Sequence, residues 1–385
     1  MVTAIAIVPV DAGVRRAYAG AMTRIAVVGA GIIGLSAAKA LRGRGADVVV
    51  YESGAPGGGQ SAGESRIFRH AHDDARLAAF ARRSRAKWRG WSEEFGRRLI
   101  SPGDAVAIGA GVEDKLALLE QAADAPAARL DADGLADRMP LLAAYSGPAM
   151  LDADGGAIHT LVAIDALSDA LSADLVADHV LSVRQLGAGT AEIRTGTGID
   201  TFDHVVLCAG RGTAPLARGA GLDLPVELSA HVRVGFAVRN PADAPLPTLQ
   251  DGSGAFGETG IYAAPAEDDH RYSVGLGETT PVSPDGRLED PAGLERLAAR
   301  TAEYVRRALP GLDPEPLSHV HCFVTTLPWG DDGVGIWSAG PVTAVAGHNL
   351  FKLAPALGEA LAETALTGAV PELLRPASRL GAARQ

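Results

Sequence analysis

Three glycines and one glutamate form the most specific chemical pattern in this 385-residue sequence. Gly29, Gly31 and Gly34 are spaced as G-x-G-x-x-G, and Glu52 follows further along the chain. In such a motif the first glycine permits a tight turn, the second lets backbone approach a pyrophosphate, and the third lets a helix pack closely. An acidic side chain at the place of Glu52 accepts hydrogen bonds from ribose hydroxyls and repels a 2′-phosphate. The pattern predicts a dinucleotide site for NAD or FAD, against the alternative of a turn that holds nothing.

A second group of chemically capable side chains lies at Arg66–His72, where two arginines and two histidines fall within seven residues. This segment is compatible with a solvated basic turn, or with a cationic wall beside a bound anion or a flavin ring. The two cysteines, Cys208 and Cys322, form neither a disulfide framework nor a C-x-x-C metal motif. We therefore predict no metal site, and a reducing, cytoplasmic location.

The elements around the glycine motif follow from the hydrophobic pattern. Ile25–Val28 predicts a strand that is buried on both faces, and Val48–Tyr51 predicts a second strand after an intervening helix. The N-terminus of that helix would direct its free N–H groups at phosphates. Further on, Phe202–Leu207 predicts a strand that runs into small residues, and Gly210 there would let backbone approach the dinucleotide again. These elements predict an α/β fold with a Rossmann-like parallel sheet.

Composition narrows the class of protein. The length suggests about two domains, and 47% of the residues are hydrophobic. No apolar run is long enough to cross a bilayer, so we expect no membrane partner. The net charge of -11 argues against a nucleic-acid surface. The basic run Arg82–Arg89 alternates with core positions and is interpreted as the solvated face of a helix. Residues 1–21 make a poor secretion signal, and we expect them to be a disordered extension.

From Arg24 to about Leu374 the chain resembles the monomeric sarcosine oxidase family, which includes N-methyltryptophan and pipecolate oxidases within the D-amino-acid oxidase superfamily. Four segments carry the resemblance: GAGIIGLSAA at 29–38, GESRIFRHAH at 63–72, HCFVTTLPW at 321–329 and GHNLFKLAPALGE at 347–359. The resemblance implies FAD and two domains, each assembled from separated pieces of chain. It implies an FAD-binding domain at 22–98, 161–222 and 326–385, and a discontinuous α+β substrate domain with an antiparallel sheet at 99–160 and 223–325.

The resemblance also implies roles for single residues. Arg66 matches an arginine over the flavin ring, while Arg69 and Lys352 match the pair that binds the substrate carboxylate. Cys322 matches the cysteine that is bonded to the flavin 8-methyl group, and Tyr262 matches a tyrosine near the substrate. Lys352 is expected to contact the cofactor as well. The alternatives to these roles are a surface lysine at the start of a helix for Lys352 and an ordinary buried thiol for Cys322.

The sequence departs from the family at several of the matched positions. Ser61 and Ala62 stand where the family has a pair of histidines, and Val324 replaces a tyrosine. A family lysine that helps the reduced flavin to react with oxygen falls near Ser273, and residues 116–351 contain no lysine. The resemblance therefore leaves open whether oxygen is the electron acceptor.

We expect FAD-dependent oxidation of a C–N bond in an amino acid or secondary amine that bears a carboxylate. Arg69 and Lys352 would dock the carboxylate, a hydride would pass to flavin N5 and leave an imine, and O2 would reoxidise the flavin with release of hydrogen peroxide. His348 and His321 are candidate bases by their neighbourhood alone. Two alternatives stay open: a biosynthetic dehydrogenase that uses a non-oxygen acceptor, and a non-catalytic subunit that carries flavin.

Overall fold

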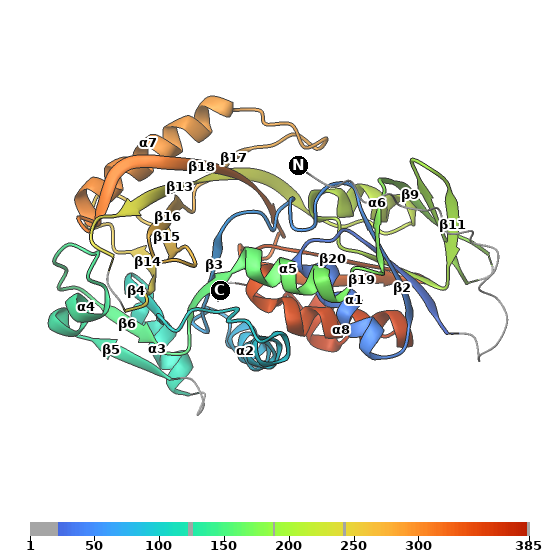
Figure 1. Ribbon diagram of the computed structural model, residues 1–385, viewed down its shortest axis with the longest axis horizontal. Coiled ribbons are helices and arrows are strands. Elements are labelled where there is room, and N and C mark those ends of the chain that lie inside the picture. The colour runs from blue at the N-terminus through green and yellow to red at the C-terminus, as the bar shows by residue number, and fades with distance from the viewer. Residues whose placement is uncertain (1–21, 122–125, 188, 242–243, 383–385) are drawn as a thin grey trace, which may run out of the picture.

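The computed structural model describes residues 22–121, 126–187, 189–241 and 244–382 (Figure 1). The extension expected at 1–21 lies outside the described residues. No helix in the described ranges is long and apolar enough to cross a membrane.

A six-stranded sheet contains the glycine motif. Its order is β19-β20-β12-β1-β2-β8, and its pairs are parallel except that β19 runs antiparallel to β20. The strands are β1 (Arg24–Val28), β2 (Asp47–Glu52), β8 (Leu175–Ala177), β12 (His204–Leu207), β19 (Val334–Ala339) and β20 (Val342–Gly347). Strands β1 and β12 are almost completely buried because helices and a small sheet cover the two faces.

One face of the parallel sheet packs against helices. Helices α1 (Ile32–Gly43) and α8 (Ala354–Thr367) contact the sheet, and α5 (Thr160–Ala170) packs on α1 while α2 (Ala75–Phe95) packs on α8. The four helices share one hydrophobic core. The other face packs against α6 (Thr213–Gly219) and the three-stranded sheet of β9 (Val180–Gln185), β10 (Ala191–Thr195) and β11 (Ile199–Phe202). The α/β architecture expected from the sequence is confirmed.

The single strand expected at Phe202–Leu207 is wrong in detail, because the chain changes sheets at Asp203. Strand β11 ends at Phe202 and β12 begins at His204. Asp203 exchanges hydrogen bonds with Arg24 of β1: its backbone N–H donates to the Arg24 carbonyl at 2.9 Å, and its carboxylate accepts from the Arg24 backbone N–H at 2.7 Å. This polar pairing lies where the chain passes from the three-stranded sheet to the six-stranded sheet.

A nine-stranded sheet forms the second half of the molecule. Its order is β17-β13-β16-β15-β14-β4-β6-β5, and β18 pairs with β13 outside this order. All pairs are antiparallel except β4 with β14. The strands are β4 (Ala105–Gly109), β5 (Ala127–Leu130), β6 (Ala149–Asp152), β13 (Glu227–Val238), β14 (Thr248–Gly252), β15 (Ile261–Pro265), β16 (Arg271–Leu276), β17 (Thr280–Pro281) and β18 (Leu312–Thr326).

The nine-stranded sheet has its own core under α7 (Pro291–Ala308), and α3 (Val112–Glu120) and α4 (Ala132–Arg138) lie at its far end. Strands β13 and β18 run side by side along the top of Figure 1, with α7 on their outer side. A two-stranded ribbon of β3 (Ser65–Phe68) and β7 (Gly156–His159) lies between the two large sheets. The antiparallel sheet agrees with expectation, while the exact domain boundaries stay a prediction.

Candidate active site

A cavity of about 1400 Å³ extends from the glycine turn to the nine-stranded sheet. It brings together residues that are far apart in the sequence. The predicted site residues on its wall are Gly29, Gly31, Glu52, Arg66, Arg69, Gly210, Tyr262, Cys322, His348 and Lys352. Gly34 is the predicted residue that does not line it, since Gly34 faces the turn from inside helix α1.

The three glycines of the turn have different physical tasks. Gly29 has a φ of +100°, and a Cβ there would lie 2.5 Å from the carbonyl oxygen of Cys208. A Cβ on Gly34 would lie 1.8 Å from the carbonyl oxygen of Gly29, so the helix packs on the turn only without a side chain. A Cβ on Gly31 would meet one atom within 4 Å, Oγ of Ser61 at 3.1 Å. Gly31 therefore presents bare backbone to the cavity, as a pyrophosphate requires.

Glu52 ties the turn to the end of β2. Its Oε2 accepts from the backbone N–H of Ala30 at 2.8 Å, and its Oε1 accepts from that of Gly54 at 2.9 Å. A carboxylate offers about four acceptor sites. Glu52 thus fixes the loop and keeps acceptor capacity toward the cavity.

The expected carboxylate-binding pair, Arg69 and Lys352, is joined through Asp332. Nη2 of Arg69 donates to Oδ2 of Asp332 at 2.9 Å, and Nζ of Lys352 lies 3.7 Å from Oδ1. His72 Nδ1 and Asn349 Nδ2 complete the shell of the carboxylate at 2.9 and 2.8 Å. Asp332 therefore organises both cations, although 263 residues separate it from Arg69.

The position of Lys352 follows from its backbone. It lies in a 3₁₀ turn, Leu350–Leu353, and its carbonyl accepts from Ser84 Oγ at 2.8 Å and from Trp88 Nε1 at 2.9 Å. Both donors come from α2, and Trp88 is completely buried. Lys352 is 4% exposed, which excludes the alternative of a surface lysine.

The pKa values of this cluster follow from burial and charge. Burial by itself raises the pKa of Asp332, but Lys352, Arg69 and His72 together hold it well below its usual range. Burial lowers the pKa of Lys352 to about 8, although Asp332 opposes the shift. Burial and the neighbouring cations Arg69 and Lys352 lower the pKa of His72 to about 3, so this imidazole is neutral.

Two guanidinium groups meet at the loop before β3. Arg66 donates to the carbonyls of Ser65 and Gln60 at 2.9 and 3.2 Å, and also to that of Ala62. Arg233, which sequence reasoning missed, donates to the same carbonyls of Ser65 and Ala62, each at 3.0 Å. The loop thus holds two positive charges side by side against the cavity.

Tyr262, His231 and His348 form a neutral group on the cavity wall. The Tyr262 hydroxyl lies 3.1 Å from Nδ1 of His231, and the rings of His231 and His348 are 6.4 Å apart. His348 Nδ1 lies 3.0 Å from the carbonyl oxygen of Asp331. Because a carbonyl only accepts, Nδ1 carries the proton and Nε2 of the neutral ring has a free lone pair. Burial lowers the pKa of His231 to about 3 and also lowers that of His348.

Three functional residues gave weak signals or none in the sequence. Arg233 interrupts the apolar run Val232–Val238, and a charge inside a buried strand was the available clue. His231 precedes that run without any motif. Asp332 lies in a glycine-containing turn and gave no signal, because its partners come from elsewhere in the chain.

The positions that depart from the family lie on the cavity wall. Ser61, Ala62, Val324 and Ser273 all line it. Ser61 Oγ accepts from the backbone N–H of Ile32 at 3.0 Å, at the start of α1. The changes therefore alter the cavity itself.

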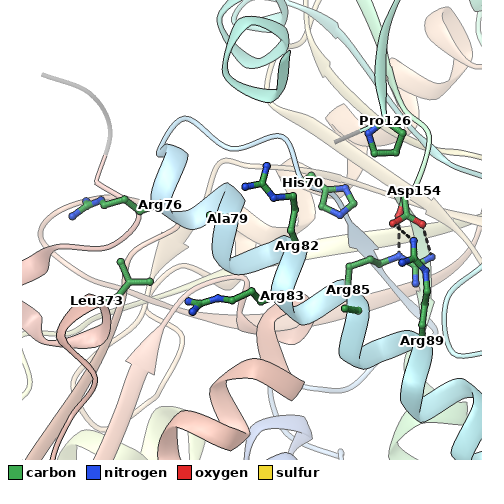
Figure 2. A pocket seen from close by; sticks show the side chains of 11 residues that line it. His70, Arg76, Ala79, Arg82, Arg83, Arg85, Arg89, Pro126, Asp154 and Leu373 are labelled. Atoms are coloured by element: carbon green, nitrogen blue, oxygen red, sulfur yellow. Dashed lines mark hydrogen bonds and ion pairs between the residues drawn. The ribbon is translucent and has the colours of Figure 1, made fainter. Parts of the chain in front are cut away.

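A second cavity, of about 850 Å³, opens beside helix α2 and has a basic wall (Figure 2). Asp154 pairs with Arg85 at 3.2 Å and with Arg89 at 2.5 Å. The Arg85 side chain is 13% exposed, so the interpretation of this run as a purely solvated face is wrong for Arg85. None of the predicted site residues lines this second cavity. Across the described ranges, no group of three or more His, Cys, Asp and Glu side chains is placed to hold a metal ion.

One cavity joins the dinucleotide turn on the parallel sheet to a large mixed sheet. This arrangement defines the two-part fold of a dinucleotide-dependent oxidoreductase. Residues 24–364 match the family model DAO, FAD dependent oxidoreductase, and the chain belongs to this family. Its place within the D-amino-acid oxidase superfamily is thereby confirmed.

Sequence comparison finds similarity to 4-methylaminobutanoate oxidase (formaldehyde-forming) of Paenarthrobacter nicotinovorans, with 31% identity over 245 residues. The match covers 59% of this chain and 29% of that protein, so the chain spans less than a third of the relative's length.

Solved structures share the fold at low sequence identity. NikD, an amino acid oxidase essential for nikkomycin biosynthesis, superposes with a TM-score of 0.79 at 20% identity, over 94% of this chain and 98% of NikD. L-Proline dehydrogenase from P. horikoshii gives 0.75 at 20% identity, over 91% and 95% of the two chains. Glycine oxidase from Geobacillus kaustophilus gives 0.72 at 21% identity, over 90% and 95%.

The residues present fit FAD, the cofactor of the family. Gly31 leaves open backbone where a Cβ would project, next to the N-terminus of α1. Glu52 supplies acceptors at the same end of the cavity. At the other end, the buried Nε of Arg233 has no hydrogen-bond partner among the described residues. Gly29, Gly31, Glu52 and Gly210 would hold the adenylate and phosphate end, while Gly34 would contribute by letting helix α1 pack on the turn.

Proposed function

We propose that this protein oxidises a C–N bond in an amino acid or a secondary amine that bears a carboxylate. One observation carries the proposal: Arg69 and Lys352 share a cavity wall with the dinucleotide turn, and Asp332 balances one of their two positive charges. Arg69 and Lys352 carry two positive charges, Asp332 carries one negative charge, and His72 is neutral. One substrate carboxylate balances this cluster. A fork-shaped guanidinium and a point-charge ammonium are suited to bind it.

The charges around the cavity also favour the reactive form of the amine. Arg66, Arg69, Arg233 and Lys352 are cations, and a like charge nearby disfavours a substrate ammonium. His231 and His348 on this wall are neutral, and Nε2 of His348 is an acceptor that an amine N–H could use. The site therefore selects the neutral amine, without a strong base.

When bound, FAD would supply the electron sink for this oxidation, with N5 as the hydride acceptor, an imine as the product, O2 as the terminal electron acceptor that becomes hydrogen peroxide, and Cys322 as the point of covalent attachment. The chain's own residues position the substrate: Arg69 and Lys352 hold the carboxylate, Tyr262 closes the cavity on the β15 side, and Arg66 adds positive charge beside the cofactor. The two cysteines are free and buried, which supports a reducing, cytoplasmic location.

The decisive experiment is an anaerobic screen of amino acids, N-methyl amino acids and cyclic imino acids for bleaching of the flavin absorbance. A substrate found in this way is then tested with Arg69→Ala. We expect KM for carboxylate substrates to rise at least tenfold, with little change for the matching amine that lacks the carboxylate. An unchanged KM for the carboxylate substrate would refute docking on Arg69.

A second candidate function is a dehydrogenase of the same substrates that passes electrons to an acceptor other than oxygen. Ser273 favours it, because this serine stands near the place of the family's oxygen-reactive lysine. Stoichiometric hydrogen peroxide release in air supports the oxidase and rejects the dehydrogenase. A flavin that no amine bleaches would instead favour the non-catalytic subunit.

A further inference from the structure

One buried cation in the cavity wall contacts the expected flavin-linking cysteine. Arg233 lies in the middle of β13 and is 7% exposed. In the register of β13 with β18, Val320 stands opposite Arg233 and Cys322 stands opposite His231. Arg233 and Cys322 are therefore diagonal neighbours on one face of the sheet. Their side chains meet, since Nη2 of Arg233 donates to Sγ of Cys322 at 3.1 Å.

The other contacts of Arg233 leave its charge uncompensated. Nη1 and Nη2 donate to the carbonyls of Ser65 and Ala62, and carbonyls carry no net charge. Nε is buried without a hydrogen-bond partner within the described residues. A buried charge without a counter-ion costs several kcal/mol, so this guanidinium favours an anion beside it.

Arg66 places a second positive charge beside that of Arg233. A Cβ on Gly63 would lie 2.6 Å from Nη2 of Arg233 and 3.0 Å from Nη1 of Arg66, so both groups crowd against this glycine, whose φ is +114°. Burial, together with Arg233, lowers the pKa of Arg66 to about 9. A neighbouring negative charge would therefore favour the charged form of Arg66.

Cys322 is the group beside this pair that is best suited to become that anion. The titratable side chains that face it are Arg233, Arg66, Tyr262 and His231. Burial raises the pKa of Tyr262, and His231 is neutral. A free thiol ordinarily ionises near pH 8.5, well before a phenol. Ionisation of Cys322 releases its proton to solvent and leaves a sulfur anion within hydrogen-bond distance of Arg233.

We propose that Arg233 holds Cys322 as a thiolate and thereby prepares Sγ for its bond to the flavin 8-methyl carbon. The lone pair of the thiolate would become the C–S bond, one methyl C–H would break with loss of its proton to solvent, and the C–H electron pair would pass to the flavin ring and from there to O2. The purpose of the thiolate rests on the proposed function, but the thiolate itself does not. The second cysteine provides an internal comparison: Cys208 is buried at the end of β12, and burial raises its pKa. A cationic neighbour raises the reactivity of a thiol, whereas apolar burial suppresses it.

The test measures thiol reactivity in the full-length chain, produced without flavin in a riboflavin-limited host. Cys322 and Cys208 are alkylated with iodoacetamide between pH 5 and 9.5, and the two peptides are quantified by mass spectrometry. The pH at which the alkylation rate is half its maximum (the midpoint) reports the formation of the thiolate. The plateau rate at high pH reports the access of iodoacetamide to Sγ. We expect Arg233→Gln to move the Cys322 midpoint up by at least one pH unit and to slow alkylation at pH 7 about tenfold. Arg233→Lys should recover part of this loss, and Cys208 should stay unreactive throughout.

An identical Cys322 midpoint in wild type and in folded Arg233→Gln would overturn the proposal. If Arg233→Gln does not fold, the wild-type midpoint decides: a value below the ordinary 8.5 supports the thiolate, and a value at or above it rejects the thiolate. Flavin attachment is scored separately, by acid precipitation after reconstitution with FAD. A low midpoint without covalent flavin would support the role of Arg233 in forming the thiolate and refute covalent attachment. Amine oxidation is tested separately, by the bleaching screen.

Discussion

Asp332 accepts a hydrogen bond from Arg69 at 2.9 Å, and so the arginine expected to receive the substrate carboxylate already holds a carboxylate of the protein. The same aspartate lies 3.7 Å from Lys352. This arrangement fixes both cations before substrate arrives, which reduces the entropy lost on binding. Asp332 also cancels one of the two positive charges of Arg69 and Lys352, and one substrate carboxylate balances the other.

Asp332→Asn should destabilise the protein by about 3 kcal/mol, because it leaves two buried cations without their shared anion. Urea unfolding at pH 7 measures the change. Asp331→Asn is the matched control, since Asp331 is exposed and contacts His348 through its backbone carbonyl, which the substitution keeps. The control should change stability by less than about 0.5 kcal/mol. Equal stability of both variants would contradict the role of Asp332.

Acid stability should report the same carboxylate. The pKa of Asp332 is held well below its usual range in the folded protein, so the unfolded chain binds more protons as pH falls through about 4. The contribution of Asp332 is therefore complete above about pH 5 and is lost progressively as pH falls below that value. Unfolding free energy measured from pH 5 to 2.5 should fall less steeply in Asp332→Asn than in wild type. Parallel curves would show that the pKa of Asp332 is not lowered in the folded state.

Carboxylate binding should weaken at alkaline pH through Lys352. The pKa of Lys352 is about 8, because burial opposes its charge. The dissociation constant of an unreactive carboxylate such as propanoate should be flat below pH 7 and rise up to tenfold per pH unit above 8. Lys352→Gln should bind more weakly and lose this dependence, which flavin absorbance changes would detect. A flat wild-type profile up to pH 9.5 would remove Lys352 from the binding site.

Glycine substitutions should separate folding of the turn from cofactor binding. Gly34→Ala places a methyl group 1.8 Å from a backbone oxygen, so little folded protein is expected. Gly31→Ala should fold but bind FAD at least tenfold more weakly, because its methyl group projects into the cavity. Gly43→Ala, at the end of α1, meets no atom within 4 Å and should be neutral or stabilise by about 0.5–1 kcal/mol. Thermal melts and FAD fluorescence quenching measure these effects; normal FAD affinity in Gly31→Ala would argue against pyrophosphate at this turn.

A lysine at position 273 should speed the reaction with oxygen. Ser273 lies on β16 opposite Gly235 and Ala264, and it lines the cavity. A positive charge there would stabilise the negative charge that develops on dioxygen. Stopped-flow reoxidation of the reduced protein should be at least tenfold faster in Ser273→Lys, with anaerobic reduction changed less than twofold. Ser273→Met supplies the length without the charge, and an equal gain in this variant would exclude an electrostatic cause.

Much of the fold was predictable because its signals are local. The glycine spacing, the flanking strands and Glu52 lie within one stretch, and each glycine has the contacts that the motif requires. The switch of sheets at Asp203 was not predictable, because its cause is a hydrogen bond to Arg24, 179 residues away.

The same distinction applies to the site. Arg69 and Lys352 could be predicted from the resemblance, whereas Asp332, which joins them, could not, because its neighbours come from across the molecule. Arg233 and Cys322 are 89 residues apart in sequence and become neighbours through strand register alone. Register between two long strands depends on the packing of the whole sheet, which no local pattern reveals.

The position of Cys322 on β18, opposite the cavity end that holds Gly31, has a consequence for folding thermodynamics. FAD held only by contacts stabilises the chain by an amount that depends on its free concentration, about 2.7 kcal/mol at one hundred times the dissociation constant. A flavin bonded to Cys322 would become part of the chain, and its stabilising effect would no longer respond to dilution.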